Sequence, residues 1–146
     1  IWGTTVVLVG GMIPLSTAVL ATGAAGQLAD GLVGIVGDAG PIALVAGLFV
    51  LTATLGQLIS NTATALIVIP IAITAATEMG ASPRPVLMAV NVAAAAALLT
   101  PVATPANMMV MEPGGYRFGD YWKLGLPLLV WYFVVAVGLV PLIWRF

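Results

Sequence analysis

Apolar runs separated by short polar connectors dominate this chain. The first and last runs, over residues 4–21 and 124–144, are close to the roughly 20 residues that an α-helix needs to cross a bilayer. The charged residues all fall in the connectors, and Tyr121, Trp122 and Trp144 flank the last run, as is typical of membrane interfaces. The pattern predicts an all-α, polytopic membrane protein.

The boundaries of these runs predict several further elements. Residues 22–40 are less apolar and predict a short interfacial helix, with Leu28, Leu32, Val33 and Ile35 on one face. Prolines and polar clusters set the remaining limits: a helix over 86–99, a half-helix over 106–111, an aqueous loop over 112–123 and a spanning helix over 124–144. The alanines at 93–97 would let two helices approach closely. Asp120 is expected at the N-cap of the last helix.

The run over residues 41–80 consists of two apolar arms with a polar cluster between them. This cluster consists of Gly56 and Gln57 and of residues 60–64, Ser60-Asn61-Thr62-Ala63-Thr64. With arms of about 18 residues, two full crossings and a re-entrant hairpin that turns near the midplane are both possible. We expect Gln57, and Asn91 further on, to form hydrogen bonds between helices.

Composition narrows the class of protein. Only 6% of the 146 residues are charged, against about 25% in soluble domains. The chain has no Cys and no His, which excludes disulfides, Cys/His zinc sites and imidazole chemistry within it. A net charge of −1 offers no basic surface for nucleic acid. Because the chain begins at Ile1 without a basic leader, we expect an internal or C-terminal fragment without a signal peptide of its own.

Ser60, Asn61 and Thr62 precede the apolar run 63–76, as capping residues precede a helix. A helix that begins there would point free N–H groups and the positive end of its dipole at a site inside the membrane, which favours an anion. A polar turn that satisfies its own backbone explains these three residues equally well.

The sequence T-P-V-A-T-P at residues 100–105 predicts a second interruption. Its prolines disfavour a continuous helix, so that the carbonyls of residues 98–100 would lack partners and Thr104 would cap a new half-helix. Unwound carbonyls suit sodium, and two interrupted helices are typical of binding sites in secondary transporters. A proline kink that serves packing is the alternative.

Three stretches, at residues 56–64, 100–107 and 113–125, resemble the divalent anion/sodium symporters, which include dicarboxylate, citrate and sulfate carriers. The resemblance runs along most of the chain. It implies two inverted repeats, each with a re-entrant hairpin and a broken helix, and a scaffold that forms a homodimer. Residues 1–146 would then be the C-terminal half of the transmembrane domain, which should not transport by itself.

The resemblance also implies a site. Ser60, Asn61 and Thr62 would contact the substrate, with Thr104 and Pro105 beside it. The implied sodium ligands come from both interruptions: Gly56, Ile59, Asn61 and Ala103. Glycine at position 56 can offer only its carbonyl. The expected function is sodium-coupled transport of a small divalent anion in the inner (plasma) membrane, with no cofactor besides the coupling ion.

Two other functions would need residues that this chain does not place within its apolar runs. A cation/proton antiporter or an arsenite-type exporter of related fold usually needs a carboxylate inside the membrane, and none of the five acidic residues lies within an apolar run. An intramembrane enzyme would need a base for Ser60, and this stretch offers none. The substrate, the coupling ion and the orientation stay open, because basic residues are balanced between the two sides.

Overall fold

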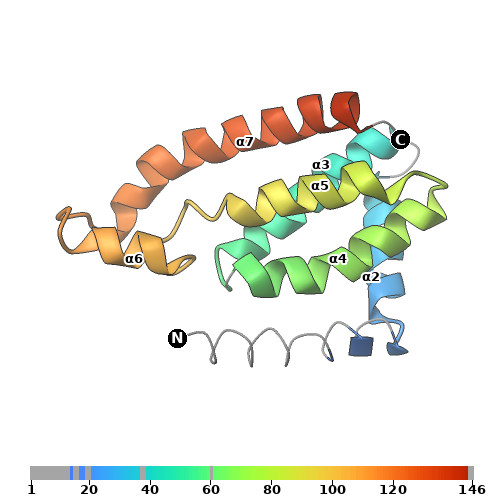
Figure 1. The fold of residues 1–146 in the computed structure, drawn as a ribbon, viewed down its shortest axis with the longest axis horizontal. Helices are drawn as coiled ribbons and strands as arrows, with labels where there is room; N and C mark the ends of the chain where they lie inside the picture. Colours follow the sequence, from blue (N-terminus) through green and yellow to red (C-terminus); the bar gives the residue numbers. More distant parts are fainter. Residues whose placement is uncertain (1–13, 15–16, 19–20, 37–38, 60, 145–146) are drawn as a thin grey trace.

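The computed structural model describes residues 14, 17–18, 21–36, 39–59 and 61–144. Within these residues all regular structure is helical, which confirms the predicted class (Figure 1). The elements are α2 (Ala24–Val36), α3 (Pro41–Gly56), α4 (Asn61–Glu78), α5 (Pro83–Ala95), α6 (Pro105–Met111), the short 3₁₀ helix η2 (Phe118–Asp120) and α7 (Tyr121–Ile143). Most of the helix expected over 4–21, and Ser60, lie outside the described residues.

The core lies where α3, α4 and α5 meet. Leu44, Val68 and Val90, one from each helix, are fully buried there. On α5 the side chains of Ala93 and Ala94 are buried as well, which confirms that the alanine-rich stretch supports close helix packing. Helix α5 consequently lies in contact with α3, α4 and α7 (Figure 1).

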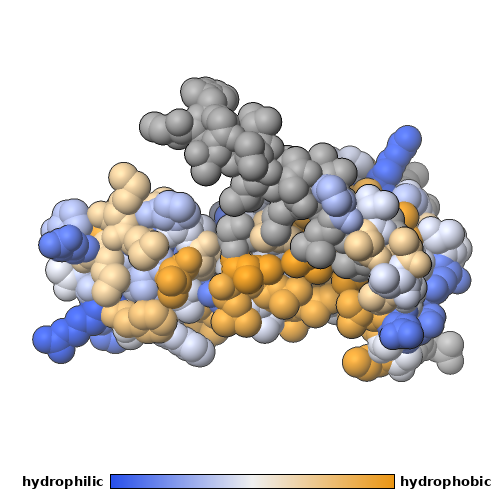
Figure 2. All heavy atoms as spheres, turned by 90° about the horizontal axis from the view of Figure 1, so that it is seen from below, coloured by the Kyte–Doolittle hydropathy of each residue, from blue (hydrophilic) through white to orange (hydrophobic). Residues whose placement is uncertain are grey.

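Helix α7 packs on this core through one stripe and leaves the rest of its surface exposed. Phe133 of α7 meets Phe49 of α3 edge to face, with ring centroids 5.3 Å apart. The segments Asn61–Glu78 and Phe118–Ile143 are long and apolar enough to cross a membrane. Figure 2 shows a hydrophobic middle with hydrophilic residues at the two ends of the long axis, the distribution that a bilayer requires.

Helix α2 lies across the other helices in Figure 1. Leu32 and Val33 are half-buried against the core, whereas Leu28 and Ile35 are exposed, so the predicted apolar face is only partly used for contact with the core. The contact is set by Gly47 of α3, whose missing side chain lets Leu32 and Val36 approach.

Three predicted helix boundaries are wrong. Helix α5 begins at Pro83 rather than at residue 86, with Ser82 as its N-cap. Helix α5 ends at Ala95 rather than at residue 99, because side chains from elsewhere bond to the backbone that follows it, as described below. Helix α7 begins at Tyr121 rather than at residue 124, and therefore includes the aromatic and basic residues expected in the loop.

The turn between α3 and α4 lies beside the break between α5 and α6, away from both ends of the long axis (Figure 1). The far ends of α3 and α4 lie at the opposite end of the molecule from α6. The two interruptions predicted from the sequence are therefore neighbours.

Candidate functional site

Hydrogen bonds join the two interruptions directly. The side chain of Gln57, just after α3, accepts from the N–H of Leu99 at 2.9 Å and donates to the carbonyl of Ala96 at 3.3 Å. The hydroxyl of Thr100 donates to the backbone carbonyl of Gln57 at 3.1 Å. The expected interhelical bonding of Gln57 is confirmed in kind, although its partners lie in the unwound segment, residues 96–104.

Two oxygens at the start of α4 stand out because they are buried and unpaired. Asn61 Oδ1 and Thr64 Oγ1 have no hydrogen-bond partner in the described part of the chain. Other helical threonines satisfy their hydroxyls by donating to the carbonyl four residues earlier: Thr52, Thr54, Thr74 and Thr77. Since an unpaired buried polar group is costly, these two oxygens are candidates for ligand binding.

The hydroxyl of Thr64 lies next to Gly56, the buried last residue of α3. A Cβ built on Gly56 would be 4.0 Å from Thr64 Oγ1 and 4.0 Å from the carbonyl oxygen of Ala94. The space that a side chain at position 56 would occupy is thus lined by oxygen atoms. Of the other implied sodium ligands, Ala103 is buried in the unwound segment and Ile59 lies partly exposed in the turn.

Asn61 and Thr62 line an open pocket of about 340 Å³ between α4 and α5. Asn91 lines it as well, and its side chain makes no hydrogen bond to another described residue, so the interhelical bond expected for Asn91 is not found within the described part of the chain. Thr104 and Pro105 do not line this pocket. The structure therefore brings two of the predicted substrate residues together and places the other two at a separate helix start.

The second interruption has the predicted local geometry. Thr104 caps α6 by accepting from the N–H of Asn107 at 3.2 Å, and Pro105 is the first residue of the new helix. One expectation is wrong, because the carbonyl of Thr100 is not free. The Asn107 amide donates to it, and to the carbonyl of Ala97, each at 3.0 Å.

Helix α7 contacts the backbone of the unwound segment at Gly125. A Cβ on Gly125 would lie 2.3 Å from the carbonyl oxygen of Leu98 and 2.8 Å from its carbon. Since both atoms belong to the backbone, no rotamer change can make room. Glycine is required here by close approach of two backbones.

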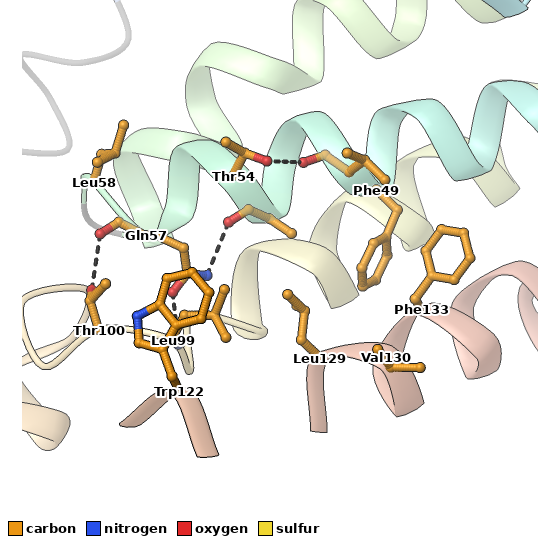
Figure 3. Close-up of a pocket in the computed structure, with 12 residues that line it drawn as sticks. Phe49, Thr54, Gln57, Leu58, Leu99, Thr100, Trp122, Leu129, Val130 and Phe133 are labelled. Atoms are coloured by element: carbon orange, nitrogen blue, oxygen red, sulfur yellow. Dashed lines mark hydrogen bonds between the residues drawn. The ribbon is translucent and has the colours of Figure 1, made fainter. Parts of the chain in front are cut away.

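A larger pocket of about 540 Å³ separates the end of α3 from α7 (Figure 3). Apolar side chains such as Phe49, Leu129 and Phe133 form most of its wall. Three polar side chains on this wall already have partners: Thr54 donates to the carbonyl of Val50, Thr100 donates to the carbonyl of Gln57, and Gln57 bonds as described above. The pocket therefore suits apolar material and not a hydrated anion.

Asp120 occupies the N-cap position of α7 as expected, but its side chain makes no capping bond to the backbone of that helix. It accepts from the N–H of Arg117 at 2.9 Å, which closes the 3₁₀ turn, and pairs with Lys123 in the first turn of α7 at 3.0 Å. Both contacts belong to the polar end of the molecule.

Sequence reasoning missed three residues of this region. Thr64, Asn107 and Gly125 are the last residues of the three stretches that resemble the symporters, but no individual role was expected for them. The signal for Thr64 was its place one turn after Asn61, which puts both side chains on one helix face. Nothing in the sequence marks which carbonyls Asn107 reaches, or what Gly125 packs against.

Comparison with known proteins places the chain in a family. The family model described as "Citrate transporter", CitMHS, matches residues 1–146. The chain is 43% identical over 141 residues to "Uncharacterized transporter YfbS" of Escherichia coli, covering 97% of this chain and 23% of that protein. It is 30% identical to "Sodium/sulfate cotransporter 1" of Chlamydomonas reinhardtii, covering 84% of this chain and 14% of that one.

The chain thus spans less than a quarter of the length of these relatives. No solved structure matches the chain. The relatives and the family carry the names of transporters, which agrees with the resemblance to anion symporters found in the sequence and with the expectation of a carrier rather than an enzyme. The chain belongs to the citrate transporter family, CitMHS.

Proposed function

We propose that the full-length protein carries a small divalent anion, a dicarboxylate, citrate or sulfate, across the inner (plasma) membrane, driven by sodium. The observation that carries this proposal is the pair of buried, unpaired oxygens, Asn61 Oδ1 and Thr64 Oγ1, at a helix start beside a second helix interruption. The algal relative named as a sodium/sulfate cotransporter adds support.

The anion binds at the start of α4. Asn61 and Thr62, with Ser60 before them, offer neutral donors, and the first turn of this 18-residue helix adds N–H groups and the positive end of its dipole. Thr104 and Pro105 start α6 and lie beside the anion from the second interruption. Neutral donors suit a dianion that must also leave, since no fixed positive charge holds it.

Sodium binds between the two interruptions. Oxygen atoms are the ligands that hard cations prefer, and Asn61 Oδ1 and the carbonyls of Gly56, Ile59 and Ala103 supply them. Thr64 Oγ1 adds the hydroxyl that glycine at position 56 cannot, because it lines the space beside Gly56. A sodium ion there lowers the cost of holding a dianion in a site of low dielectric constant.

The length of α3 and the resemblance to the anion symporters together support a proposed architecture. Helix α3 has 16 residues and is about 24 Å long, less than the roughly 30 Å of a hydrocarbon core, and its turn lies beside the helix break (Figure 1). We therefore assign α3 and α4 to a re-entrant hairpin. The chain is the C-terminal repeat of an elevator-type carrier, and the full protein is a homodimer that contains a second, inverted repeat.

Uptake into proteoliposomes tests the function. The full-length protein is reconstituted, and labelled succinate, citrate and sulfate are offered with and without an inward sodium gradient. We expect sodium-dependent accumulation of at least one of them. Accumulation driven equally well by a proton gradient in the absence of sodium would remove sodium coupling. No uptake by correctly inserted protein would favour an antiporter or exporter of related fold.

A further inference from the structure

Gln57 connects parts of the chain that are about 40 residues apart. Its amide nitrogen donates to the carbonyl of Ala53 at 3.0 Å, in the last turn of α3, and to that of Ala96 at 3.3 Å. Its amide oxygen accepts from the N–H of Leu99 at 2.9 Å. The bonds of Gln57 to Ala53 and Leu99 are drawn beside the apolar pocket in Figure 3. The side chain is 9% exposed, so water does not compete strongly for it.

The unwound segment needs such partners. Its backbone groups have left the helix, and in an apolar setting each unpaired group costs free energy. The Asn107 side chain donates to the carbonyls of Ala97 and Thr100, but Asn107 belongs to the same broken helix. The Gln57 side chain, from the hairpin formed by α3 and α4, donates to the carbonyl of Ala96 and accepts from the N–H of Leu99. Among the described residues of the hairpin, Gln57 is the one whose side chain bonds to the break.

We propose that Gln57 is a positioning residue: it ties the turn of the hairpin to the unwound segment, so that the oxygens of both interruptions reach the coupling ion in one fixed register. This inference rests on the proposed sodium-coupled transport. The hydroxyl of Thr100, which donates to the carbonyl of Gln57 at 3.1 Å, reinforces the same tie. The two interruptions consequently move as one body during transport.

The chemistry of glutamine fits this role because the position needs a donor and an acceptor at once. A methionine would fill the same volume and form none of the three bonds. A glutamate could still accept from the N–H of Leu99, but its charged carboxylate would face the carbonyl oxygens of Ala53 and Ala96. The ranking expected from these contacts is glutamine, then glutamate, then methionine.

Transport kinetics of the full-length protein test the tie. In Gln57→Met we expect the sodium concentration for half-maximal uptake to rise about tenfold, as the loss of paired buried groups implies, while the maximal rate at saturating sodium and anion stays within about twofold. Gln57→Glu should lie between wild type and Gln57→Met. A merely structural residue would lower the maximal rate, through misfolded protein, without moving the half-saturation.

Thr54→Val is the matched control. Thr54 lines the same pocket, but its hydroxyl bonds only to the carbonyl of Val50 within α3. The control should keep the sodium half-saturation of the wild type. An unchanged half-saturation in Gln57→Met, whatever its maximal rate, would overturn the inference and leave the proposed function intact.

Hydrogen–deuterium exchange tests the role of Gln57 independently of the proposed transport function. In the full-length protein in lipid nanodiscs, Gln57→Met should speed exchange of the amides in the unwound segment, where Leu99 loses its acceptor, while exchange in the core of α4 stays unchanged. If the wild type carried none of the anions, the proposed function would fail and this measurement would still decide the tie. Unchanged exchange over residues 96–100 would overturn it.

Discussion

At the turn between α3 and α4, two buried side-chain oxygens have no partner within the described residues, whereas in the unwound segment between α5 and α6 side-chain amides bond to backbone groups of Ala96, Ala97, Leu99 and Thr100. Asn61 and Thr64 supply the free oxygens. Gln57 and Asn107 supply the pairing amides. Both interruptions are polar breaks in apolar helices, and the sequence alone makes them look alike.

The difference teaches which polar groups serve structure and which serve a ligand. Hydrogen bonds from side chains stabilise an irregular backbone at membrane depth, because they replace the backbone hydrogen bonds that a continuous helix would form. Leaving a buried oxygen unpaired lowers stability, and a bound ion or substrate can recover that loss. Substitutions at the first interruption should therefore change transport, and substitutions at the second should change stability.

The largest effect is expected for Asn61→Ala. The change removes a donor for the anion and an oxygen for the ion, and should abolish uptake, a loss of about a hundredfold or more, with membrane insertion and the melting temperature retained. Thr77→Val is the control, because Thr77 lies on the same helix and bonds only to the carbonyl of Ile73. Normal uptake by well-inserted Asn61→Ala would remove Asn61 from the site.

Gly125→Ala should act on stability instead. The added Cβ meets the backbone of Leu98 at 2.3 Å, so that α7 or the unwound segment must shift, at a cost of about 1–3 kcal/mol. We expect a melting temperature several degrees lower in detergent. Gly138→Ala lies on the same helix with no atom of the described chain within 4 Å of the new Cβ, and should leave it unchanged. Equal effects in both would contradict the close contact.

The smallest expected change, and the sharpest test of the comparison, is Thr64→Val. Valine keeps the shape and removes a buried hydroxyl that has no partner, so the melting temperature should stay equal or rise. The sodium half-saturation should rise severalfold. Thr52→Val is the control, since that buried hydroxyl donates to the carbonyl of Leu48 at 2.6 Å. A Thr64→Val variant with a lower melting temperature and wild-type sodium dependence would show that Thr64 stabilises the fold and does not bind the ion.

Sequence periodicity predicted the helices and the two breaks well, because membrane helices are long, apolar and punctuated by strong signals. The cap at Thr104 and the start of α6 at Pro105 follow from local chemistry alone, and the structure confirms them. The resemblance to anion symporters is likewise confirmed by the family match.

Prediction failed where distant residues decide the local structure. Helix α5 should have continued to residue 99 by local preference, but Gln57, 39 residues before Ala96, and Asn107 bind the backbone of 96–100 instead. The exposed Asn91 and the free hydroxyl of Thr64 depend on helix rotation in three dimensions. No pattern of residue types along the chain encodes these choices.

The hydrogen bond from Gln57 to Ala96 also constrains the number of residues in α5. One residue inserted within α5 would turn the backbone after it by about 100° and advance it by about 1.5 Å, which would carry Ala96 and Leu99 away from the amide of Gln57. An insertion in the polar connector at residues 79–82, where Gly80 already has a φ of +65°, would be absorbed by the loop. Among related chains, insertions and deletions should therefore occur in this connector and spare α5.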